Sequence, residues 1–114
     1  MLKVPLTDDD VRVIGECLRA CAEGPFFRDE ETAVAYWEFH SLFGLEHSEV
    51  TRIVAAWPDV DVRDEAVVLA VNNSLGNLLG YPHGRKQAWS NFISVPPDEV
   101  ALVLARWRES AGVH

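Results

Sequence analysis

Apolar residues recur along this chain at spacings of three and four residues, which is typical of helices that bury one face. In the first such segment, Thr7 caps a helix whose first turn holds three aspartates, and Gly24 followed by proline ends it. The expected core-facing stripe of this helix consists of Val11, Ile14, Leu18 and Cys21. The pattern therefore predicts a first helix between Thr7 and Gly24.

Glycine and proline residues punctuate the rest of the chain, and the apolar periodicity between them predicts five further helices. The run 66–71 is apolar on every side, which favours a central helix enclosed on all faces over a buried strand. No segment has a convincing strand pattern. We expect the five helices at residues 29–43, at residues 46–57, from a cap at Asp61 or Asp64 to Gly80, at residues 84–93, and from about residue 96 through Trp107.

A segment of the third expected helix is repeated fifty residues later. Residues 49–57 and 99–107 share a glutamate, a valine, an alanine and the closing tryptophan, which is Trp57 in one and Trp107 in the other. An internal repeat constrains architecture more than any single motif. The simpler alternative is that any two amphipathic helices that end in tryptophan have similar sequences, without a duplication. The match continues upstream without a gap, where Leu45, Phe43, Leu42 and Phe39 fall on Val95, Ile93, Phe92 and Trp89.

The repeat and the helices together predict an all-α, six-helix single domain spanning residues 1–114. We expect two three-helix units, at about residues 7–58 and 61–108, packed about a pseudo-twofold axis with the first and fourth helices in equivalent roles. The first unit then carries six extra residues, somewhere between Arg28 and Tyr36. A length of 114 residues with 48% hydrophobic content is enough to bury one real core.

The net charge is −8, and it is unevenly distributed along the chain. Residues 1–65 hold 15 acidic and 6 basic side chains, whereas residues 66–114 hold 3 acidic and 4 basic ones. Such a first half repels nucleic acid and attracts a basic patch on another protein, which is the expected partner. The alternative to a binding role is that the acidic residues serve only to keep the protein soluble. The acidic partner face is expected at Asp29, Glu30, Glu31 and Glu38, with Tyr36 or Trp37 as an anchor.

No stretch approaches the roughly 18 apolar residues of a membrane span, and residues 1–5 lack the apolar region of a signal peptide. We therefore expect a cytoplasmic protein with no membrane partner. Cys17 and Cys21 lie four residues apart on one helix, where an unstrained disulfide is disfavoured. They could supply two metal ligands, but no suitably spaced His or Cys pair completes a zinc site. The expectation is reduced core thiols, no metal and no cofactor.

The most unusual polar segment lies at the end of the fourth expected helix, where three asparagines fall within six residues. The asparagine side chain hydrogen-bonds to nearby backbone groups in non-helical conformations, so asparagine forms helices poorly. The presence of three asparagines in a helix therefore needs a reason. One interpretation is structural: the amides satisfy backbone groups of a neighbouring turn. Gly76 in the same segment is expected to permit a close helix crossing. The other interpretation is a polar pocket for a small ligand or peptide, formed by Asn73, Asn77, Tyr81, His83 and Arg85.

The second and third expected helices, joined at Gly44, have the apolar spacing of a helix-turn-helix. DNA would be read by residues at the start of the third helix. Two acids there would face phosphates with one arginine to compensate, which favours helix-turn-helix packing without DNA binding. These residues are Glu46, His47, Ser48, Glu49 and Arg52. A DNA-binding version would draw its positive charge from Arg85, Lys86, Arg106 and Arg108.

Five short segments, at residues 24–27, 37–40, 42–45, 56–58 and 77–84, give the chain a family resemblance. In these segments it resembles a group of short bacterial proteins of unknown function, and the resemblance covers most of the chain. It implies a compact cytosolic protein. It implies no activity, and no functional residue is carried over from it.

The sequence thus favours a non-catalytic, small acidic helical protein that binds or regulates another protein, similar to an immunity protein or an antitoxin by analogy alone. The first alternative is a helix-turn-helix DNA-binding regulator. The second is an enzyme or small-ligand binder that uses the Asn/Tyr/His segment, although no Ser-His-Asp or Cys-His set can be assembled from the sequence. The oligomeric state stays open, and a homodimer is one of the alternatives.

Overall fold

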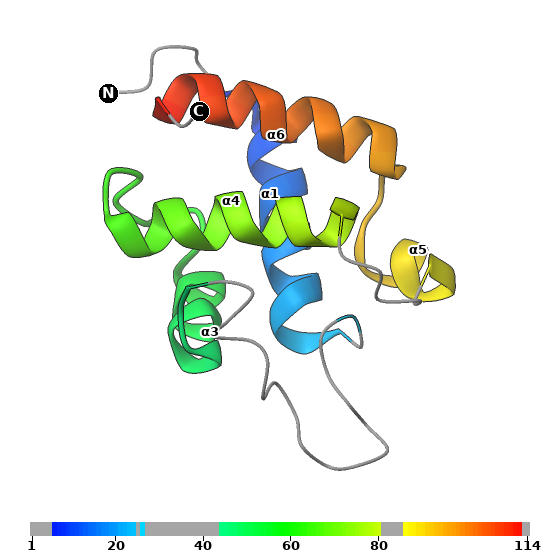
Figure 1. Cartoon of the computed structure of the whole chain (residues 1–114), viewed down its shortest axis with the longest axis horizontal. Helices are drawn as coiled ribbons and strands as arrows, with labels where there is room; N and C mark the ends of the chain where they lie inside the picture. The colour runs from blue at the N-terminus through cyan, green and yellow to red at the C-terminus, as the bar shows by residue number, and fades with distance from the viewer. Residues whose placement is uncertain (1–5, 25, 27–43, 81–85, 113–114) are drawn as a thin grey trace.

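The computed structural model describes residues 6–24, 26, 44–80 and 86–112, and within these residues the fold is all-α (Figure 1). The prediction of a helical protein is confirmed. Five α-helices are counted rather than six, because the expected helix at residues 29–43 lies outside the described residues. The helices are α1 (Asp8–Glu23), α3 (His47–Ala56), α4 (Glu65–Gly80), α5 (Trp89–Phe92) and α6 (Pro97–Ala111), and a 3₁₀ turn, η2 (Lys86–Ala88), leads into α5.

The helix boundaries follow the capping signals of the sequence. At the start of α1, the Thr7 hydroxyl accepts a hydrogen bond from the backbone N–H of Asp10 at 3.0 Å, and the Asp10 carboxylate accepts one from the Thr7 N–H at 3.3 Å. At the start of α3, the backbone N–H of Glu46 donates to the Glu49 carboxylate at 3.4 Å. Of the expected helix at residues 84–93, residues 84 and 85 lie outside the described residues, and residues 86–92 form η2 and α5.

Two helices, α1 and α4, cross at the centre of the molecule, with α4 in front of α1 in Figure 1. The third helix, α3, packs mainly against α1, whereas α6 packs mainly against α4. Smaller contacts join α1 to α6 and α3 to α4, and α5 lies against α1. Every other described α-helix therefore contacts at least one member of the central pair.

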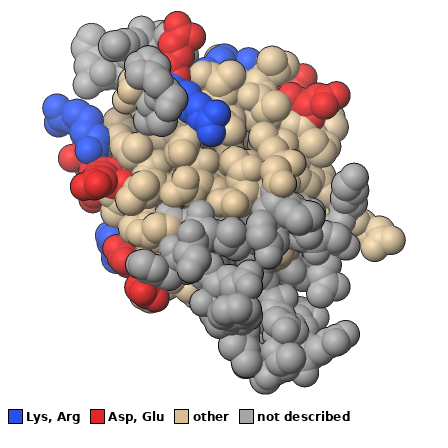
Figure 2. Space-filling view, viewed as in Figure 1, with Lys and Arg blue, Asp and Glu red and all other residues tan. Residues whose placement is uncertain are grey.

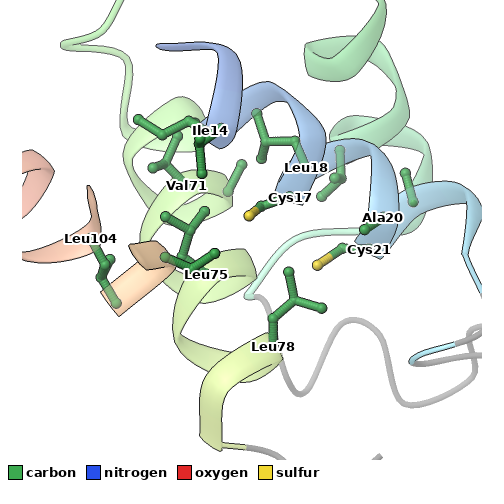
Figure 3. Close-up of a cluster of buried hydrophobic side chains, with 14 of the residues drawn as sticks. Ile14, Cys17, Leu18, Ala20, Cys21, Val71, Leu75, Leu78 and Leu104 are labelled. Carbon is green, nitrogen blue, oxygen red and sulfur yellow. The ribbon is translucent and has the colours of Figure 1, made fainter. Parts of the chain in front are cut away.

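The hydrophobic core lies at the crossing of α1 and α4 (Figure 3). Ile14 and Leu18 of α1 are fully buried, as are Val71 and Leu75 of α4. Leu104 of α6 extends the cluster on one side. Each large aliphatic side chain removed from water in this way stabilises the fold by about 1.5–3 kcal/mol.

Burial follows the same pattern on α1 and α4. When α4 is shifted by 57 residues, so that Val67 falls on Asp10, every buried residue of α4 falls on a buried residue of α1. This shift differs by one residue from the 56 that a fifty-residue repeat with six extra residues predicts. The α4 residues are Val67, Ala70, Val71, Ser74, Leu75 and Leu78, and their α1 counterparts are Asp10, Val13, Ile14, Cys17, Leu18 and Cys21. In the repeated helices, Val50 and Ile53 of α3 are buried, and so are Val100 and Val103 of α6.

An ion pair fastens the first turn of α1 to the last turns of α6. The guanidinium of Arg106 donates to both carboxylate oxygens of Asp10, from Nη2 at 2.7 Å and from Nε at 3.1 and 3.2 Å. The Asp10 side chain is 3% exposed and that of Arg106 is 42% exposed. The hydrogen bond from Arg106 holds the pKa of Asp10 below its ordinary value, although burial acts in the opposite direction.

We expect Arg106→Leu to lower the free energy of unfolding at neutral pH by about 2–3 kcal/mol, because it leaves the buried Asp10 carboxylate without its charged donor. Asp10→Asn should cost about 1–2 kcal/mol and also change the pH dependence. Because the pKa of Asp10 is lower in the folded state, its stabilisation is complete above the unfolded pKa and is lost as the pH falls through the folded pKa.

Urea denaturation between pH 7 and pH 2 measures both effects. Asp10→Asn should show a shallower loss of stability below about pH 4 than the wild type. Asp9→Asn is the matched control, because the Asp9 side chain is 87% exposed. Identical acid slopes for the wild type and Asp10→Asn would contradict the role assigned to this ion pair.

Candidate functional site

The asparagine segment has two hydrogen bonds within its own helix. The Asn77 amide donates to the backbone oxygen of Asn73 at 2.8 Å, one turn earlier in α4. Asn73 also accepts a hydrogen bond at its side-chain oxygen from the Asn72 amide at 3.2 Å, and both Asn73 and Asn77 have further interactions. The other members of the predicted pocket, Tyr81, His83 and Arg85, lie outside the described residues. The polar pocket therefore stays a prediction.

Asn72, which sequence reasoning did not single out, links α4 to α6. The Arg108 Nε donates to the side-chain oxygen of Asn72 at 2.8 Å. With Arg106 bonded to Asp10, two of the four cations proposed for DNA binding are engaged in contacts between helices. Of the other two, Arg85 and the side chain of Lys86 lie outside what the structure describes.

The start of α3, expected as the reading end of a helix-turn-helix, is also engaged in holding the fold. The His47 ring bonds through Nε2 to the backbone oxygen of Ala22 in α1 at 2.7 Å, and because a carbonyl only accepts, Nε2 is the donor. Glu46 and Glu49 are the capping pair of the helix. Among the exposed residues of α3, Arg52 is the one cation that the structure describes.

The predicted acidic face at Asp29, Glu30, Glu31 and Glu38, with its anchors Tyr36 and Trp37, falls outside the described residues. Within the described part, the carboxylates seen in Figure 2 lie near the margin of the face, and uncharged side chains occupy its middle. Asp8, Asp59 and Asp98 are exposed, and none has an ion-pair partner among the described residues.

Both cysteines are free thiols buried at the crossing of α1 and α4, as expected (Figure 3). Burial raises the pKa of Cys17 to about 12 and that of Cys21 well above its ordinary value. The Cys21 thiol donates to the backbone oxygen of Ser74 at 3.6 Å. Across the described residues, His, Cys, Asp and Glu side chains form no group of three or more that could hold a metal ion.

The structure also contains an open cleft that sequence reasoning missed. It has a volume of about 270 Å³ and lies between α1, α3 and α5. We call it the α1/α3/α5 cleft. Its walls combine half-buried aromatic and aliphatic groups with a carboxylate, a guanidinium and an amide. The lining residues are Gly15, Glu16 and Arg19 of α1, Val54 and Trp57 at the end of α3, and Asn91 and Phe92 of α5.

One wall of the cleft depends on Gly15. The Trp57 indole N–H donates to the backbone oxygen of Val11 at 3.0 Å, which lays the ring against α1. A Cβ atom at Gly15 would lie 2.8 Å from Trp57 Cδ1 and 3.0 Å from its Nε1, closer than real Cβ contacts. Glycine in the middle of a helix was the available signal, since it disfavours the helix unless packing requires it. Its partner is 42 residues away, beyond any local pattern.

The opposite wall is held by Glu16. Its carboxylate accepts hydrogen bonds from the Ser94 backbone N–H and hydroxyl, each at 2.8 Å, and from Arg12 Nη1 at 2.9 Å. Arg12 also donates to the Ser94 hydroxyl. Burial alone would raise the pKa of Glu16, but the bonds from Ser94 and Arg12 outweigh it, and the pKa is lowered. Glu16 is therefore a carboxylate near neutral pH, and it fixes the loop after α5 onto α1.

Aromatic contacts support Phe92, which lines the cleft. Phe92 meets Phe26 edge to face, with ring centroids 6.0 Å apart, and Trp89 meets Phe26 in the same manner at 6.4 Å. The Trp89 indole N–H donates to the backbone oxygen of Val95 at 2.8 Å. These contacts hold the short helix α5 in place, although it is only four residues long.

Comparisons with protein families, with curated proteins and with solved structures found no match. None of the described helices is both long and apolar enough to span a bilayer.

The buried thiols generate a prediction about reactivity. At pH 8, Ellman's reagent should modify Cys17 and Cys21 of the folded protein far more slowly than model thiols, because the raised pKa leaves little thiolate and burial blocks access. In denaturant the reagent should titrate both thiols at once. Rapid modification of either cysteine under native conditions would show that the α1/α4 crossing opens readily.

The contact between Gly15 and Trp57 generates a prediction about stability. Gly15→Ala should lower the free energy of unfolding by about 1–3 kcal/mol through overpacking, although alanine has the higher helix propensity. Gly76→Ala is the matched control, because among the described residues a Cβ there meets only Arg108 Nη2, at 3.8 Å.

Gly76→Ala should raise stability by about 0.5–1 kcal/mol. The expected close helix crossing at Gly76 thus finds no support within the described residues. Urea denaturation compares the two variants, and equal stabilisation by both alanines would contradict the role given to Gly15.

Proposed function

We propose that this protein is a small, acidic, non-catalytic module that binds another protein. The observation that supports the proposal best is the α1/α3/α5 cleft, which leaves Trp57 and Phe92 half-buried at the surface. Aromatic residues are enriched in protein interfaces, and tryptophan is frequent among the residues that dominate binding energy. A rigid aromatic wall loses little conformational freedom when a partner docks.

The charge of the protein supports a basic partner. Four of the described arginines, Arg12, Arg19, Arg63 and Arg106, are paired with carboxylates, and over the whole chain 18 acids outnumber 10 bases. With a net charge of −8, long-range attraction steers a partner with a basic patch toward the surface. In this proposal, Asp29, Glu30, Glu31 and Glu38 supply much of that attraction.

The fold is proposed to be an internal duplication of two three-helix units about a pseudo-twofold axis. The burial of Val50 and Ile53 in α3, matched by that of Val100 and Val103 in α6, supports this interpretation. So does the packing, in which α3 lies mainly on α1 and α6 mainly on α4. The free thiols Cys17 and Cys21 suit a reducing compartment, so the proposed place of action is the cytoplasm.

Affinity capture tests the proposal. The immobilised full chain, incubated with native extract at low ionic strength, should retain one stoichiometric protein with a basic surface and release it as salt is raised. The retained protein is identified by mass spectrometry and then purified. Glu30→Lys/Glu31→Lys should slow its association about tenfold at low salt.

A charge-matched control distinguishes the effect of where the substituted residues lie from the effect of the change in net charge. Glu65→Lys/Glu109→Lys changes the net charge by the same amount at exposed positions elsewhere, and it should leave the association rate closer to that of the wild type. Retention of nucleic acid in place of a protein would overturn the proposal in favour of a DNA-binding regulator. Retention of nothing above background would overturn it as well.

A further inference from the structure

We infer that the α1/α3/α5 cleft takes one large, uncharged aromatic side chain from the partner protein. The inference rests on the proposed function, because it names what the binding surface recognises. The cleft is lined entirely by residues that the structure describes: Gly15, Glu16, Arg19, Val54, Trp57, Asn91 and Phe92.

The two copies of the repeated helix differ in how far they are covered. In the second copy, Leu104 and Trp107 are 5% and 2% exposed. The corresponding residues of the first copy, Val54 and Trp57, are only half-buried, and they line the cleft. The same two positions are therefore sealed by the chain itself in one half and left accessible in the other. An apolar group from a partner would complete the packing of the first copy.

The charges in the cleft are already neutralised. Glu16 accepts hydrogen bonds from Ser94 and Arg12, and Arg19 lies 3.4 Å from the carboxylate of Glu23. An incoming charged side chain would lose hydration, and the two charged residues that line the cleft, Glu16 and Arg19, already have partners of opposite charge. An uncharged side chain avoids that loss, so the cleft selects against lysine, arginine, aspartate and glutamate.

The size and lining of the cleft favour a single aromatic ring. A volume of about 270 Å³ lies just below the roughly 300–1,000 Å³ of sites for drug-sized molecules. Trp57 and Phe92 offer ring faces and edges, against which an aromatic group packs in stacked or edge-to-face geometry. The exposed amide of Asn91 lies at the same cleft, where it is placed to hydrogen-bond a tyrosine hydroxyl, an indole N–H or the partner backbone.

Titration with blocked amino acids tests the chemistry directly. N-acetyl tryptophanamide or tyrosinamide should shift the indole N–H signal of Trp57 in a ¹⁵N spectrum, saturably, with a Kd of about 1 mM. N-acetyl lysinamide and aspartamide should leave this signal unmoved up to the same concentration. No saturable shift with either aromatic probe, or an equal shift with the charged ones, would overturn the inference.

Variants test whether the probes bind in the cleft or elsewhere on the surface. Val54→Phe, which fills the cleft, should abolish the shift, whereas Leu102→Phe adds an aromatic ring at a 52% exposed position on α6 and should leave probe binding unchanged. Asn91→Ala removes an exposed side chain, so it keeps the test informative if Val54→Phe fails to fold. It should weaken tyrosinamide about threefold and a phenylalaninamide probe less. Equal weakening of the two probes would contradict the role given to Asn91.

The captured partner supplies the second half of the test. Loss of the partner by Val54→Phe with retention by Leu102→Phe supports the cleft as its docking site. Retention by both variants would overturn the docking inference and leave the proposed function standing. Probe binding without any captured partner would instead count against the proposed function. A Trp57 signal that changes with protein concentration, without probe, would put a second copy of this chain in the cleft and overturn the inference of a different partner.

Discussion

The rest of the structure depends on the crossing of α1 and α4. Ile14 and Leu18 on one helix and Val71 and Leu75 on the other are fully buried there, within the hydrophobic core of the described chain. The other described α-helices pack on this pair and have little contact with one another. A crossing of two helices leaves room for one further helix beside each, and α3 and α6 occupy those places.

Polar contacts then fix where each outer helix lies. Helices that are held together only by hydrophobic packing can slide along each other, whereas a hydrogen bond between two specific atoms fixes the position of one helix on the other. α6 is bonded to both central helices, through Arg106 and Arg108, and α3 is bonded to α1 through the rings of His47 and Trp57. The loop after α5 is held by Ser94 on Glu16. Because these contacts are spread over both ends of α1, the walls of the cleft keep their separation.

The sequence predicted much of the fold and little of the site, and the reason is physical. Helix ends are set by neighbours in the chain, so Thr7 and Gly80 located them well. The apolar stripes identified much of the core, although in α1 the expected Val11 is only half-buried and Val13 and Cys17 are buried. Contacts between distant helices leave no such local signal. In the sequence, Arg106 has no visible partner, and only the structure places Asp10 beside it. Likewise, Gly15 is a poor helix former in the sequence, and only the structure shows that Trp57 packs against it. The cleft is made by such distant contacts.

The ion pair between Asp10 and Arg106 has a mechanical consequence. It joins the first turn of the first described helix to the last turns of the last one, so the described chain closes into a loop. Tension applied to the two ends of the chain would load this pair before it reached the crossing of α1 and α4. Rupture of the pair would leave α6 held by its packing on α4 and by the hydrogen bond from Arg108 to Asn72. Resistance to pulling is therefore set first by this ion pair, which also contributes to stability at equilibrium, and then by the apolar packing behind it.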